Sequence, residues 1–312
     1  MDEFGLIRTY FAHWPADDSV RLGVGDDAAV LAPSAGQEWV VCTDTLVAGR
    51  HFSEACAPAS IGHKALAVNL SDLAAMGAQA HSFLLALTLP EVSPDWLHAF
   101  AAGLRSLAAE AGMALVGGDT TRGPLSITIT AIGVVPAGSA LQRRGARPGD
   151  EIAVSGSLGD AALALKLGAQ APEWLRARLD QPTPRLALGC FLRGRASAAI
   201  DVSDGLAQDL GHLLEASDVA AELLADQLPT SAQFRQLATA EDTHSLQLAG
   251  GDDYELCFTA SPEDMKSILA ESPALVTRIG RILPAKRDVS RLLVLGADGA
   301  TIATPTTGYQ HF

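Results

Sequence analysis

The chain has 312 residues, of which 48% are hydrophobic, and its 22 basic and 36 acidic side chains give a formal net charge of −14 at pH 7. The length favours two domains, and the hydrophobic content is sufficient for a buried core without disulfide bonds. A surface this acidic repels nucleic acid and anionic membranes, so we expect neither of them as a partner.

The cysteines and the start of the chain indicate the compartment. None of the four cysteines forms a CxxC pair, and the first residues are acidic where a secretory signal would be basic. No apolar run approaches the roughly 18 residues that span a membrane. We therefore expect a reduced, cytoplasmic protein.

Strands and helices alternate along the first half of the chain. The hydrophobic pattern predicts strands over residues 40–43, 83–89, 115–116 and 126–135, and helices over residues 58–76 and 94–111. Ser93 is a capping residue before Pro94 at the first helical position, and Gly112 follows the end of that helix. The first of these strands is expected to end at Asp44.

A linker separates this half from the next. Residues 136–149 contain two prolines, several glycines and the cluster Arg143, Arg144 and Arg147. We therefore predict two domains, residues 1–138 and residues 139–312. In the second domain the pattern predicts strands over residues 151–154, 198–202 and 254–258, and helices over residues 160–167 and 206–215.

Aspartates recur in short motifs, most of them glycine-containing, at the predicted strand ends. The motifs are Gly25-Asp26-Asp27, Thr43-Asp44-Thr45, Gly117-Gly118-Asp119-Thr120-Thr121, Asp201-Val202-Ser203-Asp204-Gly205 and Gly250-Gly251-Asp252-Asp253. A single Gly-Asp pair is typical of an ordinary turn. Five such motifs, most of them beside apolar strands, instead predict hard oxygen ligands for Mg²⁺, which proteins bind together with substrate phosphates.

Asp72 lies in a predicted helix that is apolar around most of its circumference, so we expect a buried carboxylate. Burial of this charge costs several kcal/mol unless the group binds metal or forms a salt bridge, and both alternatives stay open. Asn69 precedes it by one turn on nearly the same face. Carboxylates gathered in one cleft would repel each other by about 4 kcal/mol per pair, so clustering itself favours bound cations.

Other catalytic motifs are absent or incomplete. The sequence contains no GxxxxGK[ST] phosphate loop and no HExxH zinc motif. The motif that begins at Asp201 resembles a nucleophile elbow but has aspartate where the first glycine belongs, so no covalent nucleophile is predicted. His51 either contacts substrate or is solvated in its loop, and Arg143 either binds a nucleotide phosphate or is an exposed linker arginine.

Four segments together resemble the thiamine-monophosphate kinase family, which belongs to the aminoimidazole ribonucleotide synthetase-like superfamily. They are residues 43–52, the helix of residues 64–78, Gly117-Gly118-Asp119-Thr120-Thr121-Arg122-Gly123 and Gly250-Gly251-Asp252-Asp253-Tyr254-Glu255-Leu256. The resemblance extends from about Phe4 to the last residue. It implies an α+β, two-domain fold of that superfamily, whose amino-terminal domains pair into a homodimer across a β-barrel-like interface.

The resemblance also implies an activity and a set of site residues. The activity is Mg²⁺-dependent transfer of the γ-phosphoryl group of ATP to thiamine monophosphate by direct in-line attack, which forms thiamine diphosphate and ADP and uses several Mg²⁺ ions. The implied metal ligands are Asp27, Thr43, Asp44, Asp72, Asp119, Asp201 and Asp204. The implied ATP contacts are Gly118, Asp119, Arg143 and Ser203, and the implied substrate contacts are His51, Asp252 and Tyr309.

Two departures from the family pattern are visible. Cys42 stands where a hydroxyl residue usually helps to hold a metal, and a neutral thiol is a poor Mg²⁺ ligand. Tyr309 stands where tryptophan is frequent, but it can still stack on a thiamine ring. The alternatives are another ATP-dependent enzyme of the superfamily or a non-catalytic nucleotide-binding module. A selenophosphate synthetase or a hydrogenase-maturation protein fits less well, because no cysteine precedes Cys42 or ends the chain.

Overall fold

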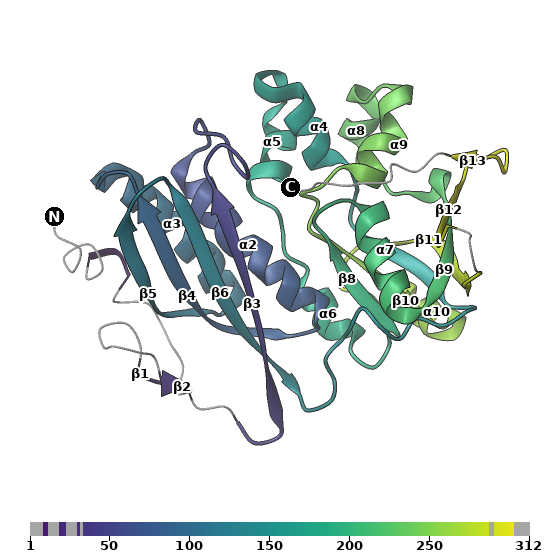
Figure 1. Cartoon of the computed structure of the whole chain (residues 1–312), viewed down its shortest axis with the longest axis horizontal. Helices are drawn as coiled ribbons and strands as arrows, with labels where there is room; N and C mark the ends of the chain where they lie inside the picture. The colour runs from purple at the N-terminus through teal and green to yellow at the C-terminus, as the bar shows by residue number, and fades with distance from the viewer. Residues whose placement is uncertain (1–8, 12–18, 23–29, 32–33, 287–289, 303–312) are drawn as a thin grey trace. The chain divides into compact units, whose positions relative to one another are not determined.

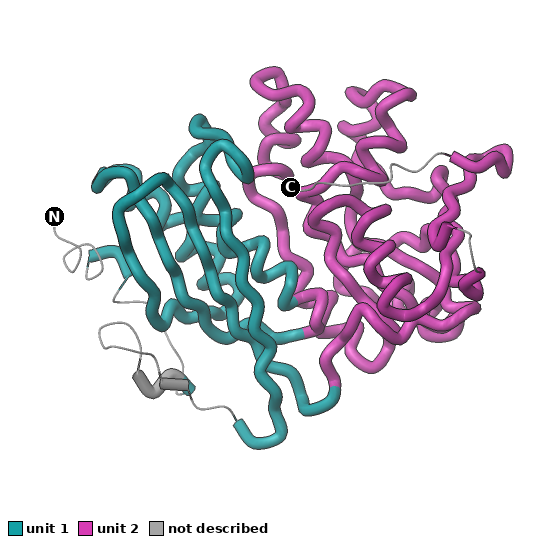
Figure 2. Tube along the Cα trace, viewed as in Figure 1, with its two compact units in different colours: residues 1–73, 78–138 teal, residues 74–77, 139–312 magenta. Residues whose placement is uncertain are grey.

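The computed structural model describes residues 9–11, 19–22, 30–31, 34–286 and 290–302. The chain divides into two compact units, one of Met1–Leu73 and Ala78–Gly138 and one of Ala74–Gly77 and Ser139–Phe312 (Figure 2). The main division follows Gly138, next to the boundary that the sequence predicts. The separate roles predicted for the two domains stay predictions.

A four-stranded sheet forms the centre of the first unit. Its strands are β3 (Gln37–Val47), β4 (Gln79–Leu89), β5 (Ala114–Arg122) and β6 (Ser126–Pro136), in the spatial order β3-β6-β4-β5. β6 is antiparallel to both of its neighbours, and β5 is parallel to β4. Within the described residues, β3 and β5 are therefore the two edges of this sheet. A separate pair, β1 (Val20–Leu22) and β2 (Val30–Leu31), is antiparallel.

Two long helices, α2 (Pro58–Ala75) and α3 (Pro94–Ala111), lie on one face of this sheet (Figure 1). They approach each other closely at two glycines. A Cβ added to Gly103 would lie 1.9 Å from the carbonyl oxygen of Ala59, and one added to Gly62 would lie 2.2 Å from that of Phe100. Any larger residue would therefore push the helices apart, and the apolar face of the sheet would lose part of its cover.

A seven-stranded sheet forms the second unit. Its strands are β7 (Glu151–Ser155), β8 (Ala198–Val202), β9 (Val219–Leu224), β10 (Glu255–Ala260), β11 (Val276–Pro284), β12 (Leu292–Leu295) and β13 (Thr301–Ile302). Their spatial order is β13-β12-β9-β11-β7-β10-β8. Neighbouring strands are antiparallel except β12 and β9, which are parallel.

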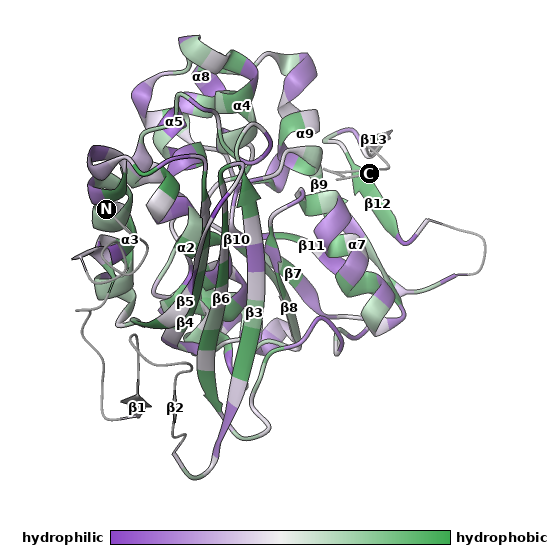
Figure 3. Cartoon of the chain, turned by 60° about the vertical axis from the view of Figure 1, so that its left-hand side comes forward, coloured by the Kyte–Doolittle hydropathy of each residue, from purple (hydrophilic) through white to green (hydrophobic). Residues whose placement is uncertain are grey.

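Helices cover this second sheet. They are α4 (Asp160–Leu167), α5 (Glu173–Asp180), α6 (Leu186–Leu192), α7 (Leu206–Ser217), α8 (Ala232–Leu237), α9 (Ala240–Ala249) and α10 (Pro262–Glu271), with short 3₁₀ turns η1 (Gly168–Gln170) and η2 (Ala225–Gln227). α7 is amphipathic, and both hydrophobic and hydrophilic residues are visible along it (Figure 3). No helix in the described part of the chain combines the length and the apolar content needed to cross a membrane.

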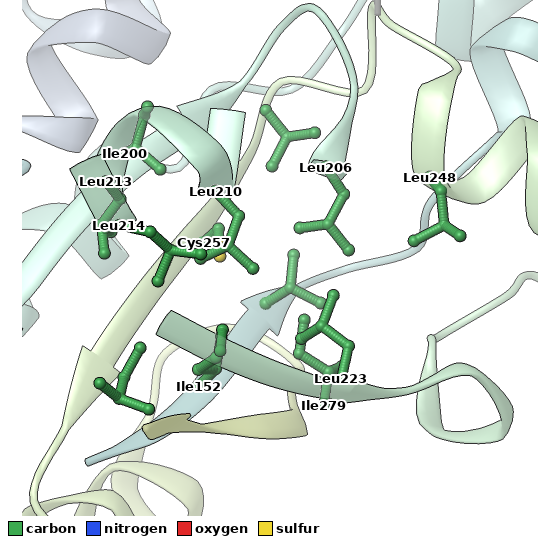
Figure 4. Close-up of a cluster of buried hydrophobic side chains, with 14 of the residues drawn as sticks. Ile152, Ile200, Leu206, Leu210, Leu213, Leu214, Leu223, Leu248, Cys257 and Ile279 are labelled. Carbon is green, nitrogen blue, oxygen red and sulfur yellow. The ribbon is translucent and has the colours of Figure 1, made fainter. Parts of the chain in front are cut away.

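The strands β7, β8 and β10 are buried on both faces, because their residues alternate between two cores. Ile152 and Cys257 belong to a cluster with the leucines of α7, among them Leu210 (Figure 4). Ala153 and Phe258, their neighbours in the chain, belong to another cluster with residues of α6 and α10. This period of two is the ordinary geometry of a strand, and helices on both sides explain why β10 is buried along its whole length.

The predicted elements are largely confirmed. The helix over residues 94–111, the helix over residues 160–167 and the strand over residues 198–202 agree with α3, α4 and β8 residue for residue. The prediction that a strand ends at Asp44 was wrong, because β3 continues to Val47 in an unbroken ladder with β6. Asp119 and Asp201 likewise lie inside β5 and β8 rather than beyond them.

The buried position of Cys257 leads to a testable expectation. Burial, together with the nearby Asp209 carboxylate, raises the pKa of the Cys257 thiol to about 12. Because the thiolate is the reactive form, very little of Cys257 would be ionised at pH 8.5. Iodoacetamide at this pH should therefore leave Cys257 unmodified in the native protein while the half-buried Cys56 reacts, as read by peptide mass spectrometry.

The control for this experiment is the same treatment after unfolding in guanidinium chloride, which should alkylate all four cysteines. Equal alkylation rates for Cys257 and Cys56 in the native protein would contradict the packing described here.

Candidate functional site

Asp44 lies on the face of β3 that carries the helices. The side chains of Cys42, Asp44 and Leu46 alternate onto the same face, and Leu46 is buried there. The Cys42 thiol donates a hydrogen bond of 3.4 Å to the backbone oxygen of Asn69 on α2. Asp44 therefore projects toward the half of α2 that also carries Asp72, which is partly exposed rather than buried as predicted.

Thr43 belongs to the opposite face of β3. Its hydroxyl donates to the backbone oxygen of Ile129 at 3.0 Å and lies 3.1 Å from the Thr130 hydroxyl. Thr45 makes the equivalent contact with Thr128 at 2.8 Å. A metal ion on the Asp44 face could reach the main chain of Thr43 but not its hydroxyl.

Gly118 and Asp119 lie on β5, at the other edge of the sheet from Asp44. The ladder aligns Asp44 with Ile129 on β6, Ile129 with Leu85 on β4, and Leu85 with Gly118. Three strand spacings separate the two edges, which amounts to about 14 Å along the sheet. A Cβ at Gly118 would lie 1.9 Å from the carbonyl oxygen of Leu85, and its φ of 152° is one that side-chain-bearing residues rarely adopt.

His51 lies in a tight turn directly after β3. Its Nδ1 accepts a hydrogen bond of 3.0 Å from the amide of Val47, so the neutral ring carries its proton on Nε2. The ammonium group of Lys64, which is only 2% exposed, donates to the backbone oxygen of His51 at 3.3 Å. This turn is therefore fixed from α2, and it presents the Nε2 proton as the remaining ring donor.

In the second unit, the predicted residues Ser203 and Asp204 occupy the turn from β8 into α7, and Asp201 lies near the end of β8. The sequence analysis did not identify the residue that organises this turn, which is Asp209. Its Oδ2 accepts hydrogen bonds from the amides of Ser203, Asp204 and Gly205 at 3.0, 3.0 and 3.1 Å. The side chain of Gln208 also donates to Asp204 at 3.2 Å.

Asp209 is 4% exposed and Asp201 is 6% exposed, so two carboxylates are buried at this turn. Burial and the negative charges of Asp201 and Asp204 together raise the pKa of Asp209 to about 7, although the amide hydrogen bonds act in the opposite direction. These three carboxylates are therefore close enough to repel one another, as expected for groups that a cation would neutralise.

Asp252 lies in a strained segment before β10. Its φ is 65° and that of Tyr254 is 49°, both in the left-handed region, where residues other than glycine are uncommon. The Tyr254 hydroxyl donates to Oδ1 of Asp252 at 3.1 Å. The Asp252 amide donates to the backbone oxygen of Ser203 at 2.8 Å, so this predicted substrate contact is joined to the turn that carries Ser203 and Asp204.

Asp253 and Glu255, which lie beside Asp252 and Tyr254 in the chain, hold this segment in place. Both carboxylate oxygens of Asp253 accept from the amide of Gly159, and burial raises the pKa of Asp253 well above its usual value. Glu255 is fully buried and accepts from Arg178 at 3.0 Å and from Arg185 at 2.6 Å through both Nε and Nη2. Ser155 donates to the same carboxylate at 2.5 Å.

Arg143 is exposed in the segment between the sheets, and the Ser217 hydroxyl donates to its backbone oxygen at 3.0 Å. The same hydroxyl accepts from the amides of Gly145 and Ala146, which fixes this turn against the end of α7. The predicted ligand Asp27 and the predicted substrate contact Tyr309 lie outside the described residues. Among the residues that are described, no three His, Cys, Asp or Glu side chains meet at metal-binding distances.

Sequence reasoning missed Asp209, Asp253 and Glu255, and signals for them were present. Asp209 shares a helix face with Leu206 and Leu213, an acidic residue on a stripe that is otherwise apolar. Asp253 and Glu255 belong to the same motif of residues 250–256 as Asp252, next to a predicted apolar strand.

The sequence was compared with models of protein families and with known proteins. The sequence model described as "AIR synthase related protein, N-terminal domain" matches residues 25–135. The thiamine-monophosphate kinase of Salmonella typhimurium is 45% identical, with 99% of this chain and 98% of that protein aligned. That of Bacillus subtilis is 35% identical, with 100% of both chains aligned.

Solved structures of thiamine-monophosphate kinases are also similar to this chain. The crystal structure of thiamine-monophosphate kinase from Stenotrophomonas maltophilia has a TM-score of 0.84 and 48% identity, and covers 91% of this chain and 93% of that one. AaThiL complexed with AMPPCP and TMP has a TM-score of 0.80 and 29% identity, and covers 90% of this chain and 89% of that one. The hydrogenase maturation protein HypE, at 20% identity and a TM-score of 0.79, shares the fold.

The fold is therefore the α+β fold of proteins related to aminoimidazole ribonucleotide synthetase, as the sequence predicts. Identities of 35–45% over the full chain go further than a shared fold. On this basis, the chain belongs to the thiamine-monophosphate kinase family.

Proposed function

We propose that this protein transfers the γ-phosphoryl group of ATP to thiamine monophosphate and releases thiamine diphosphate and ADP. The observation that carries the proposal is 45% sequence identity to a thiamine-monophosphate kinase over 99% of this chain. The similar structure of AaThiL in complex with AMPPCP and TMP supports it. A cytoplasmic location is part of the proposal, and the lack of any CxxC pair among the four cysteines supports it.

Mg²⁺ is the proposed cofactor, held by oxygen atoms of Asp27, Thr43, Asp44, Asp72, Asp119, Asp201 and Asp204. The donor set fits, because Mg²⁺ prefers carboxylate oxygens and because Asp201, Asp204 and Asp209 repel one another without a cation. Two carboxylates that bind one Mg²⁺ come within about 4 Å of each other. Asp44 and Asp119 of one chain lie much further apart, which supports several ions rather than one.

The protein's own part in the reaction is to position two anions. The acceptor phosphate of thiamine monophosphate is ionised near neutral pH, so it needs little help from a general base. Gly118, Asp119, Arg143 and Ser203 are proposed to contact ATP, and His51, Asp252 and Tyr309 are proposed to contact the thiamine substrate. His51 is suited to donate from Nε2, because its Nδ1 already accepts from the Val47 amide. Bound Mg²⁺ would neutralise charge on the phosphates during transfer.

A homodimer is also proposed, and the edges of the first sheet support it. Within the described residues, β3 and β5 each have one free edge, and Val41 on β3 is 61% exposed. Closure of two such sheets into one barrel with β5 beside the partner's β3 would shorten the distance between Asp119 of one chain and Asp44 of the other. The site would then be complete only in the dimer.

The first prediction from this proposal concerns the reaction and its metal. Purified protein should convert thiamine monophosphate and ATP to thiamine diphosphate and ADP with Mg²⁺, and EDTA should abolish the activity until excess Mg²⁺ is restored. Product formation is followed by chromatography, and ADP by a coupled assay whose enzymes are checked separately for metal dependence. Full turnover without metal, or no thiamine diphosphate with it, would overturn the proposal.

The second prediction concerns the shared site. Asp44→Asn and Asp119→Asn should each lower kcat by about 10²-fold, because each removes an electrostatic contact to the transferring group. When equal amounts of the two variant dimers are mixed, dissociated and allowed to reassociate at random, activity should return to about a quarter of the wild-type value. The reason is that half of the dimers are mixed, and each mixed dimer contains one intact site of two.

A matched control separates shared sites from sites within one chain. Asp44 and Asp72 are proposed to act from the same chain, so a mixture of Asp44→Asn and Asp72→Asn should stay inactive. Restored activity in this control, or none in the Asp44→Asn and Asp119→Asn mixture, would refute the shared arrangement.

The third prediction concerns the stereochemistry of transfer. ATP made chiral at the γ-phosphorus should give thiamine diphosphate with inverted configuration at that phosphorus, because direct in-line attack inverts it once. Retention of configuration, or a phosphoenzyme that passes its phosphoryl group to thiamine monophosphate, would instead require a covalent nucleophile.

A further inference from the structure

One oxygen atom organises the turn between β8 and α7. Oδ2 of Asp209 accepts the amide hydrogens of Ser203, Asp204 and Gly205, three consecutive residues, at 3.0–3.1 Å. A capping side chain at a helix start commonly satisfies one or two amides from a position before the helix. Asp209 instead lies in the first turn of α7 and reaches back over the residues that precede it.

The same turn is held on its other side by the segment before β10. The amide of Asp252 donates to the backbone oxygen of Ser203, and the amide of Tyr254 donates to that of Val202, both at 2.8 Å. A Cβ added to Gly251 would lie 2.5 Å from the Ser203 oxygen, so the two segments touch through their main chains. The amides of the turn therefore point to Asp209, whereas the carbonyl oxygens of Val202 and Ser203 point to the amides of residues 254 and 252.

Ser203 and Asp204 therefore have little conformational freedom, although both are partly exposed. Asp209 is only 4% exposed, so water cannot easily replace it as the acceptor of these three amides. Without this acceptor, three amides would lose their shared partner, and the side chains at residues 203 and 204 would sample other directions.

We propose that Asp209 is a positioning residue, which fixes the backbone of residues 203–205 so that Ser203 and Asp204 meet ATP and its metal in one orientation. This role rests on the proposed kinase function, but the geometry that it requires does not. Asp209 itself touches neither substrate nor metal in this proposal. Its effect is transmitted through the main chain.

Two substitutions separate geometry from charge. Asp209→Asn keeps one oxygen acceptor of the same reach and removes the charge, while Asp209→Ala removes the acceptor. A positioning role predicts a mild effect for asparagine and a large one for alanine. A metal ligand would be damaged by both. If the alanine variant does not accumulate as folded protein, Asp209→Leu removes the acceptor and keeps the same branched arrangement of side-chain heavy atoms.

The first readout does not depend on the function. Hydrogen exchange of the amides of residues 203–205, followed by mass spectrometry on the unliganded protein, should speed up by about tenfold or more in Asp209→Ala. Exchange in Asp209→Asn should stay close to that of wild type, and β10 should be unaffected in both variants. Unchanged exchange at residues 203–205 in the alanine or leucine variant would overturn the proposal, whatever reaction the protein catalyses.

The second readout uses the kinase assay. Asp209→Ala should raise the KM for ATP or the Mg²⁺ concentration for half-maximal activity by about tenfold, and Asp209→Asn by less than about threefold. A loss of folded protein alone would lower the apparent kcat and leave both concentrations unchanged, which would reduce Asp209 to a structural role. Equal losses in both variants would also overturn the proposal, because charge rather than geometry would then matter.

The matched control is Asp264→Ala. Asp264 lies in the first turn of α10 in the same unit, and its carboxylate accepts from Ser261, the capping residue of that helix. It therefore tests the loss of a first-turn aspartate where no predicted site residue is involved. It should leave the KM for ATP, the Mg²⁺ requirement and exchange at residues 203–205 as in wild type. If wild-type protein lacks kinase activity, the proposed function fails, and hydrogen exchange alone decides the role of Asp209.

Discussion

A carboxylate that leaves water must be met by donors, and the second unit is organised by this requirement. Asp209 is met by three backbone amides, Asp253 by the amide of Gly159, and Glu255 by two arginines and a serine. Arg178 and Arg185 reach Glu255 from outside the sheet, and Gly159 reaches Asp253 from the start of α4. The acidic residues that make this chain strongly negative therefore also hold the turns around β8 and β10 in place.

In the candidate site, neighbouring acidic residues differ in burial: some are buried and hold the main chain, and others are partly exposed. Along residues 252–255, Asp253 and Glu255 are buried among their donors, while Asp252 is partly exposed and bonded to the Tyr254 hydroxyl. Along residues 201–209, Asp209 is buried below the turn and Asp204 is partly exposed in it. In both segments a buried acid fixes the main chain from which the proposed functional acid projects.

The sequence predicts elements well where the signals are local. α3 matched because a serine and a proline mark its start and Gly112 adopts a left-handed conformation at its end. The end of β3 was missed because Asp44 continues a ladder whose partner, β6, comes about 80 residues later, and no local pattern reveals that pairing. β9 and β11 were also missed: β9 (VAAELL) and β11 (VTRIGRILP) contain alanine, glycine and arginine, which weaken the local strand signal, and their pairing with each other joins segments far apart in the chain.

The candidate site shows the same limit. Motif resemblance supplied Asp44, Asp119 and Asp204, but only the strand order reveals that Asp44 and Asp119 lie on opposite edges of one sheet. Asp209 could be suspected from its apolar helix face, yet its three amide partners depend on the path of the chain before the helix. Residue type and spacing therefore indicate the chemistry of the site. The fold is needed to tell which acidic residues hold the main chain and which are available to ligands.

The left-handed backbone at Asp252 has a consequence for how such a protein changes over time. A residue with a side chain in this conformation costs about 1 kcal/mol relative to glycine, so the native fold carries a standing penalty at this position. Selection for thermal stability alone would favour glycine at this position and remove the carboxylate. An aspartate that persists there under such selection would therefore be retained for what its side chain does, and libraries screened only for stability would be expected to lose this carboxylate.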